Sequence, residues 1–152
     1  IDLSLFTSYL TLDAGINEGK NEVQFLFVYD KESRHLQHCQ PSDLQKELNG
    51  VAFQSPYGEF SFAGVPSEGM VSREDLFMDL LSVVSDSADV KRMIVVSFNE
   101  EYGKKVTDVL QGLKGKEVMQ FRMNEPEIPV NYKWDMLAFP VMHSLGIRAE
   151  EL

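Results

Sequence analysis

The residues best suited to phosphate chemistry form a short acidic turn near the start of the chain. Asp13 and Gly15 follow the apolar stretch Leu10–Leu12. A carboxylate can hold Mg²⁺, and a glycine lets backbone amides approach a phosphate. The same two residues also supply ordinary turn geometry. Because the chain has no phosphate-binding lysine motif and no second acidic motif, Asp13 and Gly15 are only a weak candidate for cofactor binding, and we expect no cofactor.

Metal-binding side chains gather in the segment Arg34–Cys39, which contains His35, His38 and Cys39. Side chains on a strand alternate between its two faces, so histidines three residues apart point to opposite faces and cannot bind one ion without a bulge. A structural zinc site needs four ligands, and the remaining histidine is His143. We therefore expect no metal site.

Motifs of the common catalytic sites are absent. The sequence contains no Gly-x-Ser-x-Gly elbow, no Gly-x4-Gly-Lys-Ser loop, no Gly-x-Gly-x-x-Gly and no His-Glu-x-x-His. The adjacent carboxylates Glu74/Asp75 and Glu100/Glu101 fall in the first turns of predicted helices, where the helix dipole favours negative charge. We therefore predict that the chain is not an enzyme and assign no catalytic residue.

The charge balance argues against nucleic acid as a partner. Among 152 residues, 14 Lys plus Arg oppose 24 Asp plus Glu, which gives a net charge of -10. Nucleic acids are bound chiefly by clustered cations, so we expect no nucleic acid. The charge also suggests a partner with a basic face, and a solvated acidic surface explains it nearly as well. The hydrophobic content of 43% predicts a folded domain, and the single cysteine favours a reducing compartment.

The first half of the chain predicts strands. Apolar and hydroxyl residues are mixed over Leu3–Leu12, and Val23–Tyr29 has the clearest strand pattern. With Arg34–Cys39 as a third strand, these segments predict an antiparallel meander. Segment 41–66 is interpreted as a small inserted subdomain, with a short helix ending at Gly50 and a β-hairpin beyond it.

The second half alternates helices and strands. The predicted elements are a helix from Ser72, a strand over Val90–Phe98, a helix from Asn99, a strand over Glu117–Met123 and a last helix over 132–145, bent at Pro140. The whole order is βββ-(insertion)-αβαβα in a single module over 1–152. This order predicts an α/β fold with a mixed sheet, as in the ribonuclease H-like half of an actin-like fold.

Aromatic residues concentrate in two places that could contact a partner. Phe53, Tyr57 and Phe60 lie in the predicted hairpin, and Tyr132 and Trp134 begin the predicted last helix. Aromatic side chains are enriched at interface hot spots, so these five residues are the candidate partner interface. Packing on the sheet is the alternative explanation.

Two motifs carry a resemblance to a known family. Leu10–Gly15 places Asp-x-Gly after the predicted first strand, where actin-like ATPases have a phosphate-side hairpin, and Ala138–Arg148 is similar to their terminal helix with its Gly-[Leu/Ile]-x-Arg segment. With the element order, the chain resembles the cytoplasmic actin-like domain of inner-membrane assembly proteins of type IV pilus and type II secretion machines. This is the PilM and L-protein group, which includes biogenesis proteins of bundle-forming and other type IVb pili.

The resemblance implies a non-enzymatic scaffold at the cytoplasmic face of the bacterial inner membrane, with its membrane anchor outside these residues. Its partners would be the assembly or secretion ATPase, inner-membrane pilus subunits or a second copy of the chain. Complete actin-like ATPases have two modules, and Ile16 and Asn17 stand where active members have small hydroxyl residues. The alternatives are a nucleotide-binding actin-like or ribonuclease H-like enzyme using Asp13, and an unrelated small α/β interaction module.

Overall fold

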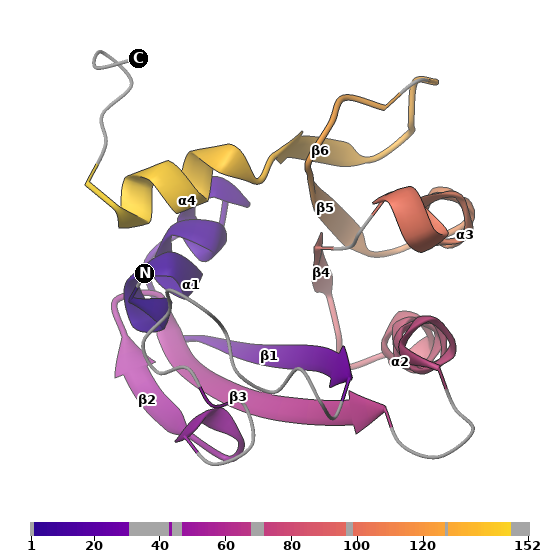
Figure 1. Ribbon diagram of the computed structural model, residues 1–152. Helices are drawn as coiled ribbons and strands as arrows, with labels where there is room; N and C mark the ends of the chain where they lie inside the picture. Colours follow the sequence, from indigo (N-terminus) through magenta and orange to yellow (C-terminus); the bar gives the residue numbers. More distant parts are fainter. Residues whose placement is uncertain are drawn as a thin grey trace. The chain divides into compact units, whose positions relative to one another are not determined.

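The structure is a computed structural model that describes residues 2–30, 43, 47–67, 72–96, 99–126 and 128–146 (Figure 1). It confirms the α/β class. The chain divides into two compact units: the first comprises Ile1–Arg73 and Pro140–Leu152, and the second comprises Glu74–Phe139. The sequence patterns, which predict one module, do not indicate this division.

The first unit is built on a three-stranded sheet of β1 (Asn21–Asp30), β2 (Ala52–Ser55) and β3 (Gly58–Ser67). The strand order is β1-β3-β2, with β3 parallel to β1 and antiparallel to β2. The predicted strand over Val23–Tyr29 and the predicted hairpin are therefore confirmed. The hairpin residues of segment 41–66 supply β2 and part of β3, and β3 is the central strand of the sheet.

One face of this sheet carries an aromatic core. Phe25 and Phe62 are register partners in β1 and β3, and their rings stack with centroids 4.9 Å apart. Phe60 packs edge-on against Phe25 at 5.1 Å and Phe53 at 5.6 Å. Buried Leu3 and Leu48 belong to the same cluster. These aromatic side chains stabilise the unit chiefly because their large apolar surfaces are buried away from water.

Helix α1 (Leu3–Asp13) lies over this aromatic face (Figure 1). The prediction of a strand over Leu3–Leu12 is wrong, and the three-stranded antiparallel meander is wrong with it, because its first member is a helix. Asp2 caps the helix by accepting hydrogen bonds from the amides of Ser4 and Leu5. The predicted strand Arg34–Cys39, the metal candidates His35, His38 and Cys39, and most of the predicted helix before Gly50 lie outside the described residues. Gly50 has a φ of 83°.

The apolar periodicity of helix α1 is not visible in the sequence, because threonines occupy two of its buried positions. The helix buries residues at helical spacing, which are Leu3, Thr7, Leu10 and Thr11. The Thr7 hydroxyl donates to the Leu3 carbonyl at 2.7 Å, and the Thr11 hydroxyl donates to the Thr7 carbonyl at 2.9 Å. These bonds satisfy two hydroxyls that face the core. Residue types that favour strands therefore occupy the buried face of a helix.

The second unit is a parallel α/β layer whose helix and strand predictions are mostly confirmed. Its elements are α2 (Arg73–Asp86), β4 (Arg92–Val96), α3 (Asn99–Gln111), β5 (Glu117–Arg122) and β6 (Lys133–Met136). The strands pair in parallel in the order β4-β5-β6. Helix α3 joins β4 to β5, as a parallel pair requires.

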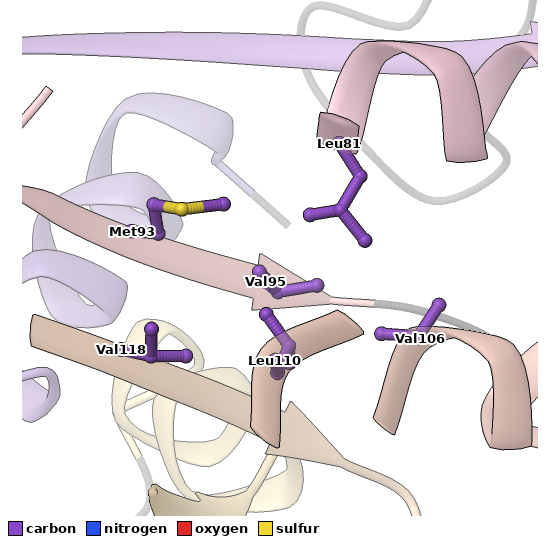
Figure 2. Packing of buried hydrophobic residues seen from close by; sticks show 6 residues of the cluster. All are labelled: Leu81, Met93, Val95, Val106, Leu110 and Val118. Atoms are coloured by element: carbon purple, nitrogen blue, oxygen red, sulfur yellow. The ribbon is translucent and has the colours of Figure 1, made fainter. Parts of the chain in front are cut away.

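The core of the second unit lies between its sheet and its two helices (Figure 2). The buried cluster is formed by Leu81 from α2, Met93 and Val95 from β4, Val106 and Leu110 from α3, and Val118 from β5. Both helices therefore cover the same face of the sheet (Figure 1). Lys105 on α3 also bonds Glu74 in the first turn of α2, at 2.6 Å.

The predicted last helix over 132–145 is wrong in its first part. The residues Lys133–Met136 form strand β6, and the helix α4 spans only Ala138–Ser144. Pro140 stands in the first turn of α4, where a missing amide costs no intrahelical bond, so it marks a helix start and not a bend. Because the described strands pair as two separate three-stranded sheets, a ribonuclease H-like arrangement is not confirmed.

Candidate functional site

The predicted site residue Asp13 is the last residue of α1 and pairs with a histidine 130 positions away. Its Oδ2 lies 3.2 Å from Nδ1 of His143, in the last turn of α4. The Asp13 side chain is 17% exposed and that of His143 is 39% exposed. Both residues belong to the first unit. The pair joins one helix from the beginning of the chain to another from its end.

The surroundings of the pair hold the imidazole in place. The ring of Tyr9, one turn before Asp13, lies 5.3 Å from the His143 ring at an angle of 45°. Beyond Asp13, the amide of Gly15 donates to the Leu12 carbonyl, and Gly15 has a φ of 86°, which ends the helix. Gly15 thus has the turn role that its residue type indicates.

The position of Asp13 disfavours phosphate binding. The last turn of a helix carries partial negative charge, which repels a phosphate and also the Asp13 carboxylate itself. The His143 imidazole compensates by giving this carboxylate a partner. The predicted strand-end phosphate hairpin does not form, because Asp13 ends a helix.

Chemically, an Asp–His pair can orient a base. The carboxylate bonded to Nδ1 sets the ring and leaves Nε2 for proton transfer, as in hydrolases that add a nucleophile. In the part of the chain that the structure describes, the hydrogen bond to the Asp13 carboxylate is the only one that the His143 side chain makes. No group of three metal-binding side chains is found among the described residues. The pair thus has two of the three residue types of such a triad, and it links α1 to α4.

The aromatic residues predicted to form an interface in the hairpin lie in the core of the first unit. Phe60 is completely buried, and Phe53 and Tyr57 are half-buried and pack against the same cluster. Phe60 therefore has no surface to offer a partner, while Phe53 and Tyr57 have little. Aromatic density in this hairpin reflects packing between α1 and the sheet.

The predicted interface residues of the second unit belong to strand β6 and its approach. The Tyr132 hydroxyl donates to Oε1 of Gln120 at 2.7 Å, and the Arg122 guanidinium donates to the same oxygen at 3.1 Å. Gln120 has no exposed surface, so this oxygen needs its donors. Trp134 is the half-buried register partner of Gln120. Tyr132 thus serves a buried polar network.

Sequence reasoning missed His143 and Gln120. No spacing rule connects His143 with Asp13, because tertiary packing alone brings them together. The sequence pattern could have indicated the buried role of Gln120, because it is a polar residue at a position of strand β5 that faces the apolar helices. Such a residue needs a partner inside the fold.

Comparison with known proteins gives one match. Over residues 1–152 the chain belongs to a protein family whose description is "family of unknown function" (DUF6621). No curated protein and no solved structure matches the chain. Among the described residues, no helix has both the length and the apolar character to cross a membrane.

Proposed function

We propose that this member of the DUF6621 family is a non-enzymatic scaffold domain that docks other proteins. The resemblance described above suggests its setting, the inner-membrane assembly complex of a type IV pilus or type II secretion machine, at the cytoplasmic face. Its partners there would be the assembly ATPase or neighbouring subunits. The actin-like, ribonuclease H-like arrangement belongs to the same proposal. Asp13 does not support this arrangement, because it ends a helix and does not follow a strand.

The observation that carries the scaffold proposal is the outward face of α1. No charged residue occurs from Leu3 to Leu12. Leu5 and Leu12 are 41% and 47% exposed, although Thr7 and Thr11 on the other side are buried. Leu5, Tyr9 and Leu12 recur at helical spacing, and we call them the α1 stripe; half-buried Tyr9 also packs against His143 of α4, so the two leucines are its exposed members. Exposed leucines gain free energy when they leave water, so a partner on the α1 stripe would complete the burial of this helix.

A binding measurement tests docking on the α1 stripe. The purified chain is immobilised and the assembly ATPase of the same organism is passed over it. We expect binding that weakens at least about tenfold in the variant Leu5→Gln/Leu12→Gln, because the lost apolar contacts are central to the stripe. The matched control is Val83→Gln on α2, which is 67% exposed and distant in sequence. Equal binding by all three proteins would remove the α1 stripe from the proposal.

The rival function is an enzyme that uses Asp13, and the Asp13–His143 pair is the observation that favours it. Isothermal titration with Mg²⁺–ATP separates the two. The scaffold proposal expects no heat of binding. Micromolar binding that is lost in Asp13→Ala and in His143→Ala would replace the scaffold with a nucleotide-binding protein.

A further inference from the structure

The face of the β1-β3-β2 sheet opposite the aromatic core has two chemically different ends. Near the start of β1, Glu22 is the register partner of Glu59. Further along, Leu26 pairs with Ala63 and Val28 with Val65. We call these six residues the outer sheet face. All six are exposed or half-buried, and Leu26 is 39% exposed.

The acidic end of the outer sheet face lacks compensation within the described residues. Neighbouring strands are about 4.8 Å apart, so Glu22 and Glu59 place two negative charges side by side. Neither carboxylate has an ion-pair partner in the part of the chain that the structure describes. Two neighbouring carboxylates repel each other, so a cation supplied from outside would stabilise the pair.

The apolar end provides a second, independent requirement. Leu26, Val28 and Val65 present aliphatic side chains that gain free energy if a partner removes them from water. A partner must therefore offer an apolar surface next to a basic one. A nucleic acid would meet the Glu22–Glu59 pair with phosphates, and a second copy of the chain, with net charge -10, would meet it with further negative charge.

We propose that the outer sheet face binds an amphipathic helix of a partner protein. The apolar stripe of that helix covers Leu26, Val28 and Val65, and its Lys or Arg residues contact Glu22 and Glu59. The six residue steps from Glu22 to Val28 span about 20 Å. A helix of about 13 residues covers this length. This inference rests on the scaffold function proposed above and identifies the chemistry of one partner.

The test uses the full chain and a synthetic probe. The probe is a fluorescein-labelled helical peptide of about 15 residues with a leucine stripe and lysines in its last two turns. A matched acidic peptide has glutamates in place of the lysines. Fluorescence anisotropy at low ionic strength measures binding to the wild type and to two variants, Glu22→Lys/Glu59→Lys and Leu26→Gln. Circular dichroism checks that each variant is folded.

We expect the basic peptide to bind the wild type and the charge-reversed variant to bind it at least about tenfold more weakly, while gaining affinity for the acidic peptide. Leu26→Gln should weaken the basic peptide by a similar factor. The matched control Asp108→Lys/Glu125→Lys makes the same change in net charge at two exposed residues of the second unit and should lose little affinity.

Three outcomes would overturn the inference. Equal loss in the control variant would mean that net charge alone attracts the peptide. Unchanged binding by Leu26→Gln would mean that the apolar end is not used. A dimer of the wild-type chain in analytical ultracentrifugation that dissociates in Leu26→Gln would identify a second copy as the occupant. None of these results concerns binding at the α1 stripe. The scaffold proposal is tested separately, by the Leu5→Gln/Leu12→Gln measurement.

Discussion

Gly58 stands where the neighbouring backbone leaves no room for a side chain. It begins β3 with a φ of 127°, and a Cβ built there would lie 1.9 Å from the Asn21 carbonyl oxygen. Asn21 is fastened to the same turn, because its side-chain amide donates to the Tyr57 carbonyl at 2.7 Å. The parallel pairing of β1 with β3 therefore begins at a contact that only glycine permits.

We expect Gly58→Ala to lower the free energy of unfolding by roughly 2–4 kcal/mol, from backbone strain and overpacking together. Urea denaturation followed by circular dichroism measures the change. The matched control is Gly15→Ala, where φ is 86° but nothing lies within 4 Å of the added Cβ. It should cost only about 1–2 kcal/mol. Equal costs at the two positions would show that strain alone, and not the contact with Asn21, matters at Gly58.

At the scale of elements, helix α1 depends on its N-cap residue, Asp2, because its interior offers few other helix signals. The Ser4 hydroxyl donates to the Asp2 carboxylate at 2.7 Å, and this bond, helped by the amides of Leu5 and Ser4, lowers the pKa of Asp2 below its ordinary 3.8. Desolvation acts in the opposite direction and is second in size to the effect of the Ser4 hydroxyl. The ionised form of Asp2 therefore binds the helix start better than the protonated form does.

We expect Asp2→Ala to destabilise the chain by about 1 kcal/mol near neutral pH, because it removes the N-cap. Since the folded pKa of Asp2 is lowered, its contribution is complete above pH 3.8 and is lost as the pH falls through the folded pKa. Asp2→Asn keeps the cap without the titration, so it should retain most of the stability and lose this pH dependence. Thermal unfolding at several pH values tests both variants; equal pH dependence in the wild type and Asp2→Asn would contradict the assignment.

Most elements with a strong period could be predicted from the sequence. The apolar strand β4 and the amphipathic helix α3 are found where their patterns place them. Helix α1 could not be predicted, because Thr7 and Thr11 share its buried face with two leucines, while Leu5 and Leu12 are exposed. Asp2 was the available helix signal. Strand β6 was mistaken for a helix because four residues are too few to establish a period of two.

The candidate site was less predictable than the fold. Asp13 is recognisable as a residue that could do chemistry, but its partner His143 lies on α4, and only the packed first unit brings them together. The aromatic residues of the hairpin were recognisable as energetically important. The sequence could not decide whether Phe60 faces a partner or the core, since both uses favour the same residue types.

At the scale of the whole molecule, the two units should respond separately to local damage. We expect His143→Ala to speed amide exchange in the last turn of α1 by roughly three- to tenfold, which corresponds to the loss of one hydrogen bond. Exchange in β4 and β5 should stay unchanged. Hydrogen exchange with mass spectrometry measures both regions in one sample.

The control for this experiment is Lys105→Ala, which breaks the exposed ion pair with Glu74 in the second unit. Exposed pairs contribute little, so this variant should leave both regions protected. Faster exchange throughout the chain in His143→Ala would show instead that the units unfold together.

The discontinuous first unit also has a consequence for the order of events during synthesis. Its sheet and α1 leave the ribosome before the second unit, whereas α4, which begins at Ala138, is completed only after Glu74–Phe139 has been made. The second unit is continuous, so it can complete its core while the first still lacks its last helix. The Asp13–His143 contact can form only after α4 has left the ribosome, and until then the nascent chain exposes the side of α1 that α4 later contacts. A chaperone that binds apolar segments would find its target there during that interval.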